Sequence, residues 1–274
     1  MRAKTYKDQL EFNRLRFSCV NRILDLHKAA NAGHIGSSLS CAELLIYLHF
    51  FRMNPEDKFI LSKGHGSSAL YSVLAEMGKI SPKIMSTHYK DGTYLAAHPP
   101  CGLNKIGGII FGTGSLGHGL SLSAGLALST KFTERKMNIY CILSDGDCNE
   151  GSTWEAAMFA AHHNLNNLLV IIDNNGIQGF GKTSEVLNME SLENKWKSFN
   201  FDVVVAKNGN DFNNLKSAFS VLDQINSKKP KCIIAKTIKG NGVSFMQDRM
   251  EWHYLSMNDE QYEKSKKENF TKNA

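Results

Sequence analysis

The sequence predicts an α/β protein built on a doubly wound parallel sheet with helices on both faces. Short apolar runs of strand length alternate with segments of helical spacing along much of the 274-residue chain. Two of these runs, 138–143 and 168–172, break abruptly into polar turns, as buried strands do. Between them, 152–164 has apolar residues at helical spacing, with Ser152 or Thr153 as the expected N-cap. The three segments predict a βαβ unit, whose two strands are parallel and end at the same edge of the sheet.

The alternation continues on both sides of this unit, and no internal repeat or linker interrupts it. The predicted elements are helices at 6–30, 40–51, 69–77, 116–128 and 212–224, and strands at 57–61, 202–206 and 231–237. From about Met257 onward the tail is polar and low in apolar residues. We therefore expect its end to be mobile.

Composition excludes several classes of protein. Hydrophobic residues make up 42% and charged residues 21% of the chain, which is typical of a soluble globular protein and suits one domain over residues 1–274. The net charge of +6 is spread along the chain, so we expect no nucleic-acid partner. No apolar stretch is long enough to span a bilayer and no signal peptide opens the sequence, which predicts a cytoplasmic protein that does not bind membranes. The six cysteines form no C-x-x-C pair, which favours reduced thiols.

Polar side chains follow both strands of the βαβ unit. Asp145 comes after the first strand and Asn175 after the second, so the two converge at one edge of the sheet. One Asp, one Asn and a backbone carbonyl provide the oxygen ligands that Mg²⁺ takes when phosphates complete its shell. Taken singly, Asp145 fits a helix cap and the Asn-Asn-Gly sequence fits a simple turn. Together, about thirty residues apart, they resemble the thiamine-diphosphate signature, which binds a metal and a phosphate at a strand end.

Histidines in loops form a second set of candidates. His65 lies in a Gly-rich turn between a strand and a helix, where backbone N–H groups and the helix dipole attract an anion. We expect it to contact a phosphate. His34 lies in a Gly-flanked loop and His98 precedes a Pro pair, and each alone fits ordinary turn chemistry. The glycine-rich segment 107–119 indicates that the backbone approaches a ligand or a neighbour closely there.

These motifs together resemble one family. The segments AGHIGSS, LSKGHGSSALY, AAHP, GTGSLGHG, SDGDCNEG, DNNGIQ and KTIKGNGVSFM, the last followed by a Trp-His pair, occur in the order and spacing of the diphosphate-binding domain of transketolase. The resemblance extends roughly from Arg14 to His253, and it is far more specific than any one motif. Two positions depart from the family pattern: Ser144 stands where Gly is usual, and His118 stands where Gln is usual.

The resemblance implies thiamine diphosphate and Mg²⁺ as cofactors, and it implies a role for each matching residue. The positions that match the metal ligands are Asp145, Asn175 and the carbonyl of Ile177. The positions that match the catalytic histidines are His34, His65, His98 and His253. The positions that match cofactor contacts are His65, Gly114, Leu116, Gly146, Glu150, Asn175 and His253.

The implied roles differ within this set. His65, Gly146 and His253 match residues on the diphosphate, whereas His34 and His98 match residues beside the sugar substrate. The remaining matches are Gly114 and Leu116 against the thiamine, and Glu150 as a carboxylate that links the two cofactor sites of a dimer.

The resemblance also implies an activity and a partner. Transketolases transfer a two-carbon ketol unit from a ketose to an aldose, and a full-length member is more than twice as long as this chain. The chain resembles the amino-terminal subunit of a two-chain transketolase. We therefore expect a carboxy-terminal subunit that supplies the pyrimidine-binding domain, in a heterotetramer with two copies of each chain, and sugars or sugar phosphates as substrates.

Three alternatives stay open at this point. The α subunit of a 2-oxoacid dehydrogenase shares the Asp145 and Asn175 frame, but His34, His98 and the GTGSLGHG loop favour transketolase. Deoxyxylulose-phosphate synthase normally keeps both halves in one chain. A non-catalytic regulatory subunit is disfavoured because the metal and histidine set is intact.

Overall fold

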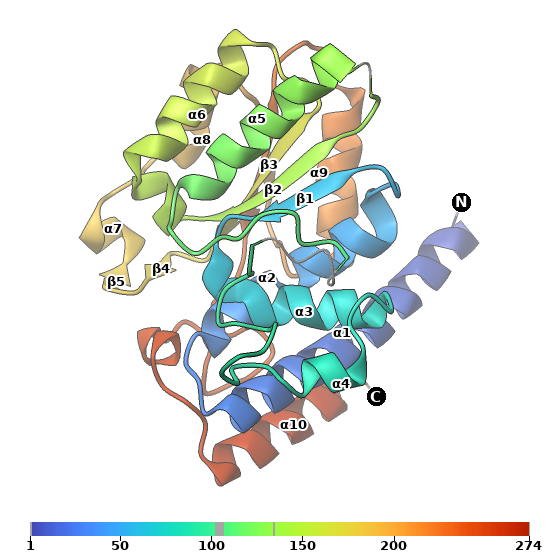
Figure 1. The fold of residues 1–274 in the computed structure, drawn as a ribbon, viewed down its shortest axis with the longest axis vertical. Helices are drawn as coiled ribbons and strands as arrows, with labels where there is room; N and C mark the ends of the chain where they lie inside the picture. The colour runs from blue at the N-terminus through green and yellow to red at the C-terminus, as the bar shows by residue number, and fades with distance from the viewer. Residues whose placement is uncertain (1, 102–106, 134, 274) are drawn as a thin grey trace.

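The part of the chain that the computed structural model describes, residues 2–101, 107–133 and 135–273, is built around a five-stranded parallel sheet. The strands are β1 (Lys58–Leu61), β2 (Ile139–Ser144), β3 (Leu168–Asn174), β6 (Asp202–Ala206) and β7 (Lys231–Lys236). Their order is β1-β2-β3-β7-β6, and each neighbouring pair is parallel. A small antiparallel ribbon of β4 (Ile177–Gln178) and β5 (Gly181–Lys182) lies apart from the sheet (Figure 1).

Helices cover both faces of the sheet, as predicted (Figure 1). The α-helices are α1 (Arg2–Ala30), α2 (Ile35–Tyr47), α3 (Ser67–Glu76), α4 (Pro82–Met85), α5 (His118–Thr133), α6 (Gly151–His162), α7 (Thr183–Val186), α8 (Leu192–Ser198), α9 (Phe212–Gln224) and α10 (Asp259–Asn273). Shorter helical turns occupy Leu48–Arg52, Gly64–Gly66, Gly146–Asn149 and Met250–His253. The predicted doubly wound α/β fold is therefore confirmed.

Side-chain alternation along the strands divides the core into two parts. In β2, Ile139, Cys141 and Leu143 are buried in a cluster with residues of α5, α6 and α8. The intervening Tyr140 and Ile142 are buried with residues of α1, α2, α3 and α9. Because successive side chains of a strand point to opposite faces, a continuous apolar run is what a strand covered on both faces requires.

Two predicted helix starts are wrong. The second helix begins at Ile35 and not at 40, so the Gly-flanked His34 is its N-cap, with a left-handed φ of 66°. Neither Ser152 nor Thr153 caps α6, because Glu150 occupies the N-cap position and makes no side-chain cap bond. The Ser152 hydroxyl instead donates to the Gly117 carbonyl (3.2 Å). These polar side chains therefore connect the helix to neighbouring loops and do not serve its own first turn.

The polar tail contains a helix that was not predicted, and the mobility of its end stays a prediction. Residues 259–273 form α10, which packs along α1 (Figure 1). The Tyr262 hydroxyl and the Lys266 ammonium both contact Oδ1 of Asp25, each at 2.7 Å, and Ser265 is fully buried. Polar contacts fix this helix, which is why a count of its apolar residues did not predict it.

No helix among the described residues is both long enough and apolar enough to cross a membrane.

Candidate active site

The carboxyl ends of the parallel strands bring the candidate residues to one edge of the sheet. His65 follows β1 through the turn at Gly64–Gly66, Asp145 directly follows β2, and Asn175 directly follows β3. The chain that leaves β7 contributes Lys239 and then His253. Ligands bind at this edge in parallel α/β sheets, because the strands hold their ends in register while the loops remain free to differ.

These residues line a cavity of about 240 Å³. Every residue that the sequence indicated as a site residue lines it, except Glu150; the set is His34, His65, His98, Gly114, Leu116, Asp145, Gly146, Asn175, Ile177 and His253. Ser37, Lys63, Gln178, Phe180 and Tyr254 are among the other lining residues. Segments from most of the chain therefore meet at a single place.

Asp145 is buried, and both of its carboxylate oxygens are held by hydrogen bonds. Oδ1 accepts from the Gly146 N–H (3.0 Å), and Oδ2 accepts from the Gly176 N–H (2.7 Å) and the Thr183 hydroxyl (3.0 Å). Burial, together with the nearby charge of Asp173, raises the pKa of Asp145 to about 6. A cation beside the carboxylate offsets both effects, so this position favours a bound positive charge.

Asn175 and Ile177 add neutral oxygens to the same cavity. Oδ1 of Asn175 accepts from the Ile177 N–H (3.0 Å), and its Nδ2 donates to the Ser40 hydroxyl (3.0 Å). The Ile177 carbonyl accepts from the Lys239 ammonium (3.3 Å). One carboxylate, one amide oxygen and one carbonyl match the hard-oxygen chemistry of Mg²⁺, which relies on phosphates and water for the rest of its shell.

Four histidine rings converge in the cavity. The ring centroid of His34 lies 4.8 Å from that of His253, 5.7 Å from His65 and 6.2 Å from His98. The ring centroids of His65 and His253 are 5.6 Å apart. The rings come from loops that are far apart in the sequence, and no motif alone places them together.

Burial lowers the pKa of each of these rings. The pKa of His34 falls to about 4 and that of His253 to about 3, while the pKa values of His65 and His98 are also below the usual range. The charge of Lys239 adds to the effect of burial at His253. The rings are therefore neutral near pH 7, and each offers one N–H donor and one acceptor nitrogen.

Lys239 determines which nitrogen of His253 carries the proton. Its ammonium lies 2.9 Å from Nδ1 of His253. An ammonium only donates, so Nδ1 is the acceptor and the proton of the neutral ring is on Nε2. His253 therefore presents an N–H on its other side.

His34 is oriented by its backbone. Its N–H donates to the His253 carbonyl (3.0 Å), which joins the loop before α2 to the segment after β7. Nδ1 of His34 is buried and has no hydrogen-bond partner among the described residues. A ring nitrogen of this kind is available to a ligand.

Glycines let two turns approach each other at the side of the cavity. Gly114 has a φ of +154°, and a Cβ there would lie 3.2 Å from the His98 ring. A Cβ at Gly64 would lie 2.8 Å from the Gly114 nitrogen. The turn that carries His65 and the glycine-rich loop therefore pack backbone to backbone, which requires glycine at both positions.

Glu150 lies outside the cavity. It is exposed at the start of α6, where a Cβ on Gly117 would approach its side chain at 2.6 Å. The departure at Ser144 is accommodated by Asp147, whose Oδ2 accepts from both the Ser144 N–H (2.8 Å) and its hydroxyl (2.7 Å). His118 is exposed at the start of α5.

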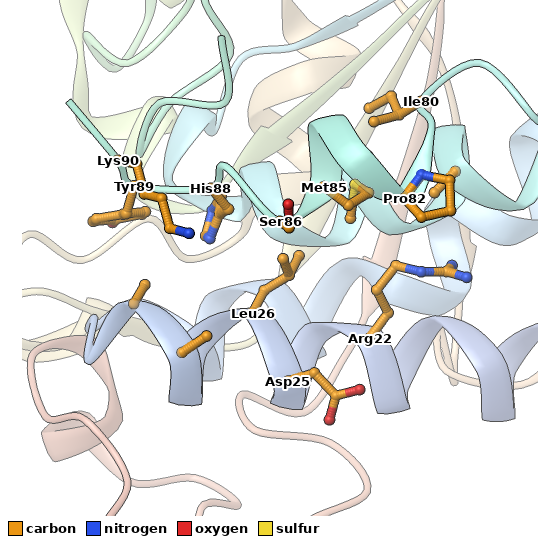
Figure 2. Close-up of a pocket in the computed structure, with 13 residues that line it drawn as sticks. Arg22, Asp25, Leu26, Ile80, Pro82, Met85, Ser86, His88, Tyr89 and Lys90 are labelled. Carbon is orange, nitrogen blue, oxygen red and sulfur yellow. The ribbon is translucent and has the colours of Figure 1, made fainter. Parts of the chain in front are cut away.

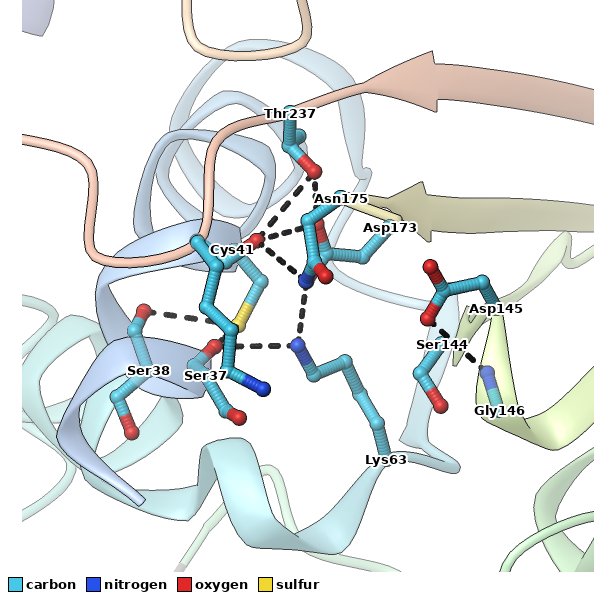
Figure 3. Close-up of polar contacts among 12 residues, drawn as sticks. Ser37, Ser38, Cys41, Lys63, Ser144, Asp145, Gly146, Asp173, Asn175 and Thr237 are labelled. Carbon is cyan, nitrogen blue, oxygen red and sulfur yellow. Dashed lines mark hydrogen bonds and ion pairs between the residues drawn. The ribbon is translucent and has the colours of Figure 1, made fainter. Parts of the chain in front are cut away.

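Two lysines near the site lie within the motifs, but neither was predicted as a site residue. Lys63 is fully buried and pairs with Asp173 in β3 (Figure 3). Lys239 is also buried, with 1% of its surface exposed. Burial, followed by the charge of Lys63, lowers the pKa of Lys239 to about 8. The available signal was a lysine two or three residues after a buried strand, since a buried ammonium requires an anionic partner, either in the protein or in a ligand.

A larger cavity lies elsewhere, between α1 and the segment that begins at Ile80 (Figure 2). Its volume is about 710 Å³, and Leu26 and Met85 face it from opposite sides. Its lining contains none of the residues that the motifs indicated. Size alone therefore does not identify the active site of this chain.

The sequence model of one family, described as the thiamine diphosphate binding domain of transketolase, matches residues 10–273. The chain belongs to the transketolase family. The thiamine-diphosphate-binding domain of this family thus accounts for the fold and covers nearly the whole chain.

Curated transketolase relatives agree in length as well as in sequence. An apulose-4-phosphate transketolase subunit from Phocaeicola vulgatus is 37% identical, over 98% of this chain and 95% of the relative. The 6-deoxy-6-sulfo-D-fructose transketolase subunit SqwG from Clostridium sp. is 37% identical, over 84% of this chain and 86% of the relative. Both relatives are therefore subunits of about the same length as this chain.

Solved transketolases share the fold over part of their length. The transketolase from Campylobacter jejuni superimposes with a TM-score of 0.85 at 26% identity, over 95% of this chain and 43% of the solved one. The transketolase from Leishmania mexicana has a TM-score of 0.86 at 24% identity, over 94% of this chain and 41% of the solved one. The chain thus spans about two-fifths of these solved transketolases.

Proposed function

We propose that this chain is the amino-terminal subunit of a two-chain transketolase. In this proposal it binds thiamine diphosphate together with Mg²⁺, and it acts with a carboxy-terminal subunit to transfer a two-carbon ketol unit from a ketose to an aldose. The observation that carries the proposal is the convergence of Asp145, Asn175 and Ile177 with the buried Lys63 in one cavity, beside the buried Lys239 that donates to the Ile177 carbonyl. Such a set suits a metal–diphosphate pair.

The charges in the cavity fit such a ligand. Lys63 lines the cavity with its ammonium paired to Asp173, and Lys239 is buried beside it with a lowered pKa. A diphosphate adds negative charge near Lys239, which favours its protonated form. The Asp145 carboxylate then has Mg²⁺ as its counter-ion. The Lys239 ammonium and the Asp145 carboxylate would each gain a partner of opposite charge from the ligand.

The histidines suit the hydroxyl groups of a sugar. As neutral rings, His34 and His98 donate or accept hydrogen bonds with sugar hydroxyls, and His253 presents its Nε2–H. Thiamine diphosphate, when bound, supplies the nucleophilic carbon that allows the bond beside a ketose carbonyl to break and form again. The chain's own part is to anchor the cofactor, orient the sugar and accept or return protons at the ring nitrogens.

An exposed apolar rim supports a partner subunit. Phe180 and Tyr254 line the cavity, yet they are 87% and 57% exposed. Large apolar side chains beside a ligand cavity favour contact with a second protein surface. The names of the relatives point the same way, because a protein named as a subunit has at least one other chain in its complex.

The names of the relatives suggest which substrates to try. Apulose-4-phosphate and 6-deoxy-6-sulfo-D-fructose each carry an anionic group at the end of a sugar. An anionic ketose is therefore the first donor class to test, with small aldoses as acceptors. No observation on this chain favours a 2-oxoacid as its substrate.

The test is a two-carbon transfer assay with thiamine diphosphate, Mg²⁺ and a panel of anionic ketoses. We expect no turnover by the purified chain alone and robust turnover after its carboxy-terminal partner is added, with a mass of two copies of each chain by light scattering. Robust turnover by the chain alone as a monomer contradicts the two-chain proposal. Cofactor binding by the pair without any transfer would instead support a regulatory role.

A further inference from the structure

We propose that Ser40 is a positioning residue for the metal site, and that it acts by fixing which end of the Asn175 amide faces the cavity. Asp173 in turn fixes Ser40. Ser40 lies outside the motifs and does not line the cavity, and Asp173, which begins the DNNGIQ motif, was given no role by the sequence. The inference rests on the proposed function, because it concerns the oxygen that Asn175 offers to Mg²⁺.

An amide side chain can face a cation in only one of two ways. Its oxygen accepts and binds cations, whereas its NH₂ group donates and repels them. The two ends have nearly the same shape, so packing alone scarcely distinguishes them. A metal site that uses Asn therefore needs a hydrogen-bond partner that accepts from the nitrogen and leaves the oxygen free.

The contacts around Asp173 supply that partner, because each hydrogen bond that links Asp173, Ser40 and Asn175 can run in only one direction. Asp173 is fully buried and pairs with Lys63, so it is a carboxylate and only accepts. The Ser40 hydroxyl donates its single hydrogen to Oδ1 of Asp173 (2.7 Å). The lone pairs of Ser40 are then left to accept, and Nδ2 of Asn175 lies 3.0 Å from the Ser40 oxygen. Figure 3 shows Lys63, Asp173 and Asn175 meeting at the strand end.

The polarity decides the orientation of Asn175. If the amide were reversed, its oxygen would face a Ser40 oxygen whose hydrogen is already donated, which leaves two acceptors in contact. The nitrogen must therefore face Ser40, and Oδ1 faces the side of Ile177, whose N–H donates to it at 3.0 Å. A carbonyl oxygen has a second lone pair, which remains for a metal ion.

Thr237 provides a matched control. Its hydroxyl also donates to Oδ1 of Asp173, but the hydrogen bonds of the Asn175 amide go to Ser40 and Ile177 and not to Thr237. Its contact with the Ser40 hydroxyl, at 3.3 Å, is longer than the bond between Ser40 and Asp173. Removing either hydroxyl takes one hydrogen bond from the same carboxylate oxygen, whereas only removal of the Ser40 hydroxyl leaves the Asn175 amide without its acceptor.

The experiment compares Ser40→Ala with Thr237→Val by calorimetric titration of thiamine diphosphate into the chain with its partner at a series of Mg²⁺ concentrations, from which the Mg²⁺ affinity is obtained. We expect Ser40→Ala to weaken Mg²⁺ affinity about 10-fold and Thr237→Val about twofold or less, since residues that orient metal ligands typically act at about the 10- to 100-fold level. Thermal unfolding reports whether both variants fold. If Ser40→Ala does not, Ser40→Cys keeps the volume with a weaker hydrogen-bonding group and should give the same ranking.

A second comparison, made in an Asn175→Asp background, separates the orienting role of Ser40 from a general loss of structure. In Asn175→Asp both side-chain oxygens are equivalent, so no orientation is left to fix. Ser40→Ala should therefore lower Mg²⁺ affinity by less than about twofold in that background, against about 10-fold in the Asn175 background. A purely structural role of Ser40 predicts the same loss in both.

The outcomes distinguish this inference from the function on which it rests. Equal effects of Ser40→Ala and Thr237→Val, or equal effects of Ser40→Ala in the two backgrounds, overturn the inference while Mg²⁺ binding by the unmodified chain still supports the function. An unmodified chain that binds no Mg²⁺ with thiamine diphosphate, even with its partner present, overturns both.

Discussion

The oxygen-rich part of the cavity and its histidine part are built in different ways. Asp145 and Asn175 directly follow strands β2 and β3, and every side-chain oxygen and nitrogen of the two has a hydrogen-bond partner. His34 and His98 are carried by loops, and Nδ1 of His34 has no partner among the described residues. The oxygen-rich part therefore has all of its side-chain hydrogen bonds within the protein, whereas the histidine part still has a ring nitrogen that can bond to a ligand.

In our proposal, this difference lets one fold hold a metal rigidly and still accept a variable substrate. The register of parallel strands fixes the metal side, because Ser144 pairs with Asp173 and so sets the neighbouring turns in place. Loops can change in length and sequence without disturbing that register. We therefore expect changes on the oxygen side to affect cofactor binding, and changes on the histidine side to affect turnover.

The largest expected effect is on the oxygen side. Asp145→Ala removes the one carboxylate of the metal set, so Mg²⁺-dependent affinity for thiamine diphosphate should fall by about 100-fold or more. Calorimetric titration of the full chain measures this, with exposed Asp91→Ala as the matched control. If Asp145→Ala binds thiamine diphosphate as tightly as the unmodified chain, Asp145 is not a metal ligand. The contrast between the oxygen-rich part and the histidine part of the cavity then fails as well.

Substitutions of the cavity histidines should lower turnover and leave the affinity for thiamine diphosphate nearly unchanged. His98→Ala, and His34→Asn at a position whose left-handed backbone suits Asn, should each lower turnover by the assembled enzyme about 100-fold. Thiamine diphosphate affinity should stay within about twofold, because these rings meet the sugar in our proposal. Steady-state kinetics with the partner chain, beside calorimetry, separates the two readouts. A large loss of cofactor affinity would place these rings at the cofactor instead.

A histidine outside the cavity should control stability and not activity. His27 is buried and bonds to Ser68 (2.8 Å), and burial lowers its pKa to about 4. The unfolded chain therefore binds more protons below about pH 6.5, so the stability that the neutral ring contributes is complete above that pH and is lost as pH falls toward 4. The loss should reach about 1 kcal/mol at pH 5.5. Urea unfolding from pH 7.5 to 4.5 checks this, and His27→Gln should show a shallower dependence.

The smallest expected effect is the cost in stability of changing a ring that has spare hydrogen-bonding capacity. His34→Asn should change the free energy of unfolding by less than about 0.5 kcal/mol, because Nδ1 gives up no bond. His27→Asn should cost about 2 kcal/mol, since both of its ring nitrogens have partners. Equal costs at the two positions would show that His34 is as structural as His27.

Much of the fold could be predicted because it depends on local patterns. The strand at Asp202–Ala206 and the helix at Phe212–Gln224 have the predicted bounds, since their apolar residues recur at strand and helix spacing. The structure adds that the Asp211 side chain caps this helix by accepting from the Asn214 N–H. The helix in the tail was not predicted because α10 makes polar contacts with α1, which no local pattern reveals.

The candidate site also contains residues that sequence patterns could place and residues that they could not. Asp145 and Asn175 could be placed at one edge because parallel strands share their carboxyl ends. Lys239, whose ammonium reaches both His253 and the Ile177 carbonyl, could not be placed, because those contacts join loops that only the folded chain brings together. The role of Ser40 required the direction of hydrogen bonds around Asp173, which sequence patterns do not specify.

The most direct test of the central claim is the binding of thiamine diphosphate by this chain with its partner, measured by calorimetry in Mg²⁺ and again after the metal is removed with a chelator. We expect clear binding in Mg²⁺ and its loss in the chelator, with recovery when Mg²⁺ is restored, because Asp145, Asn175 and the Ile177 carbonyl hold the diphosphate through the metal. Binding of equal strength in the chelator, or none in Mg²⁺, would contradict the account.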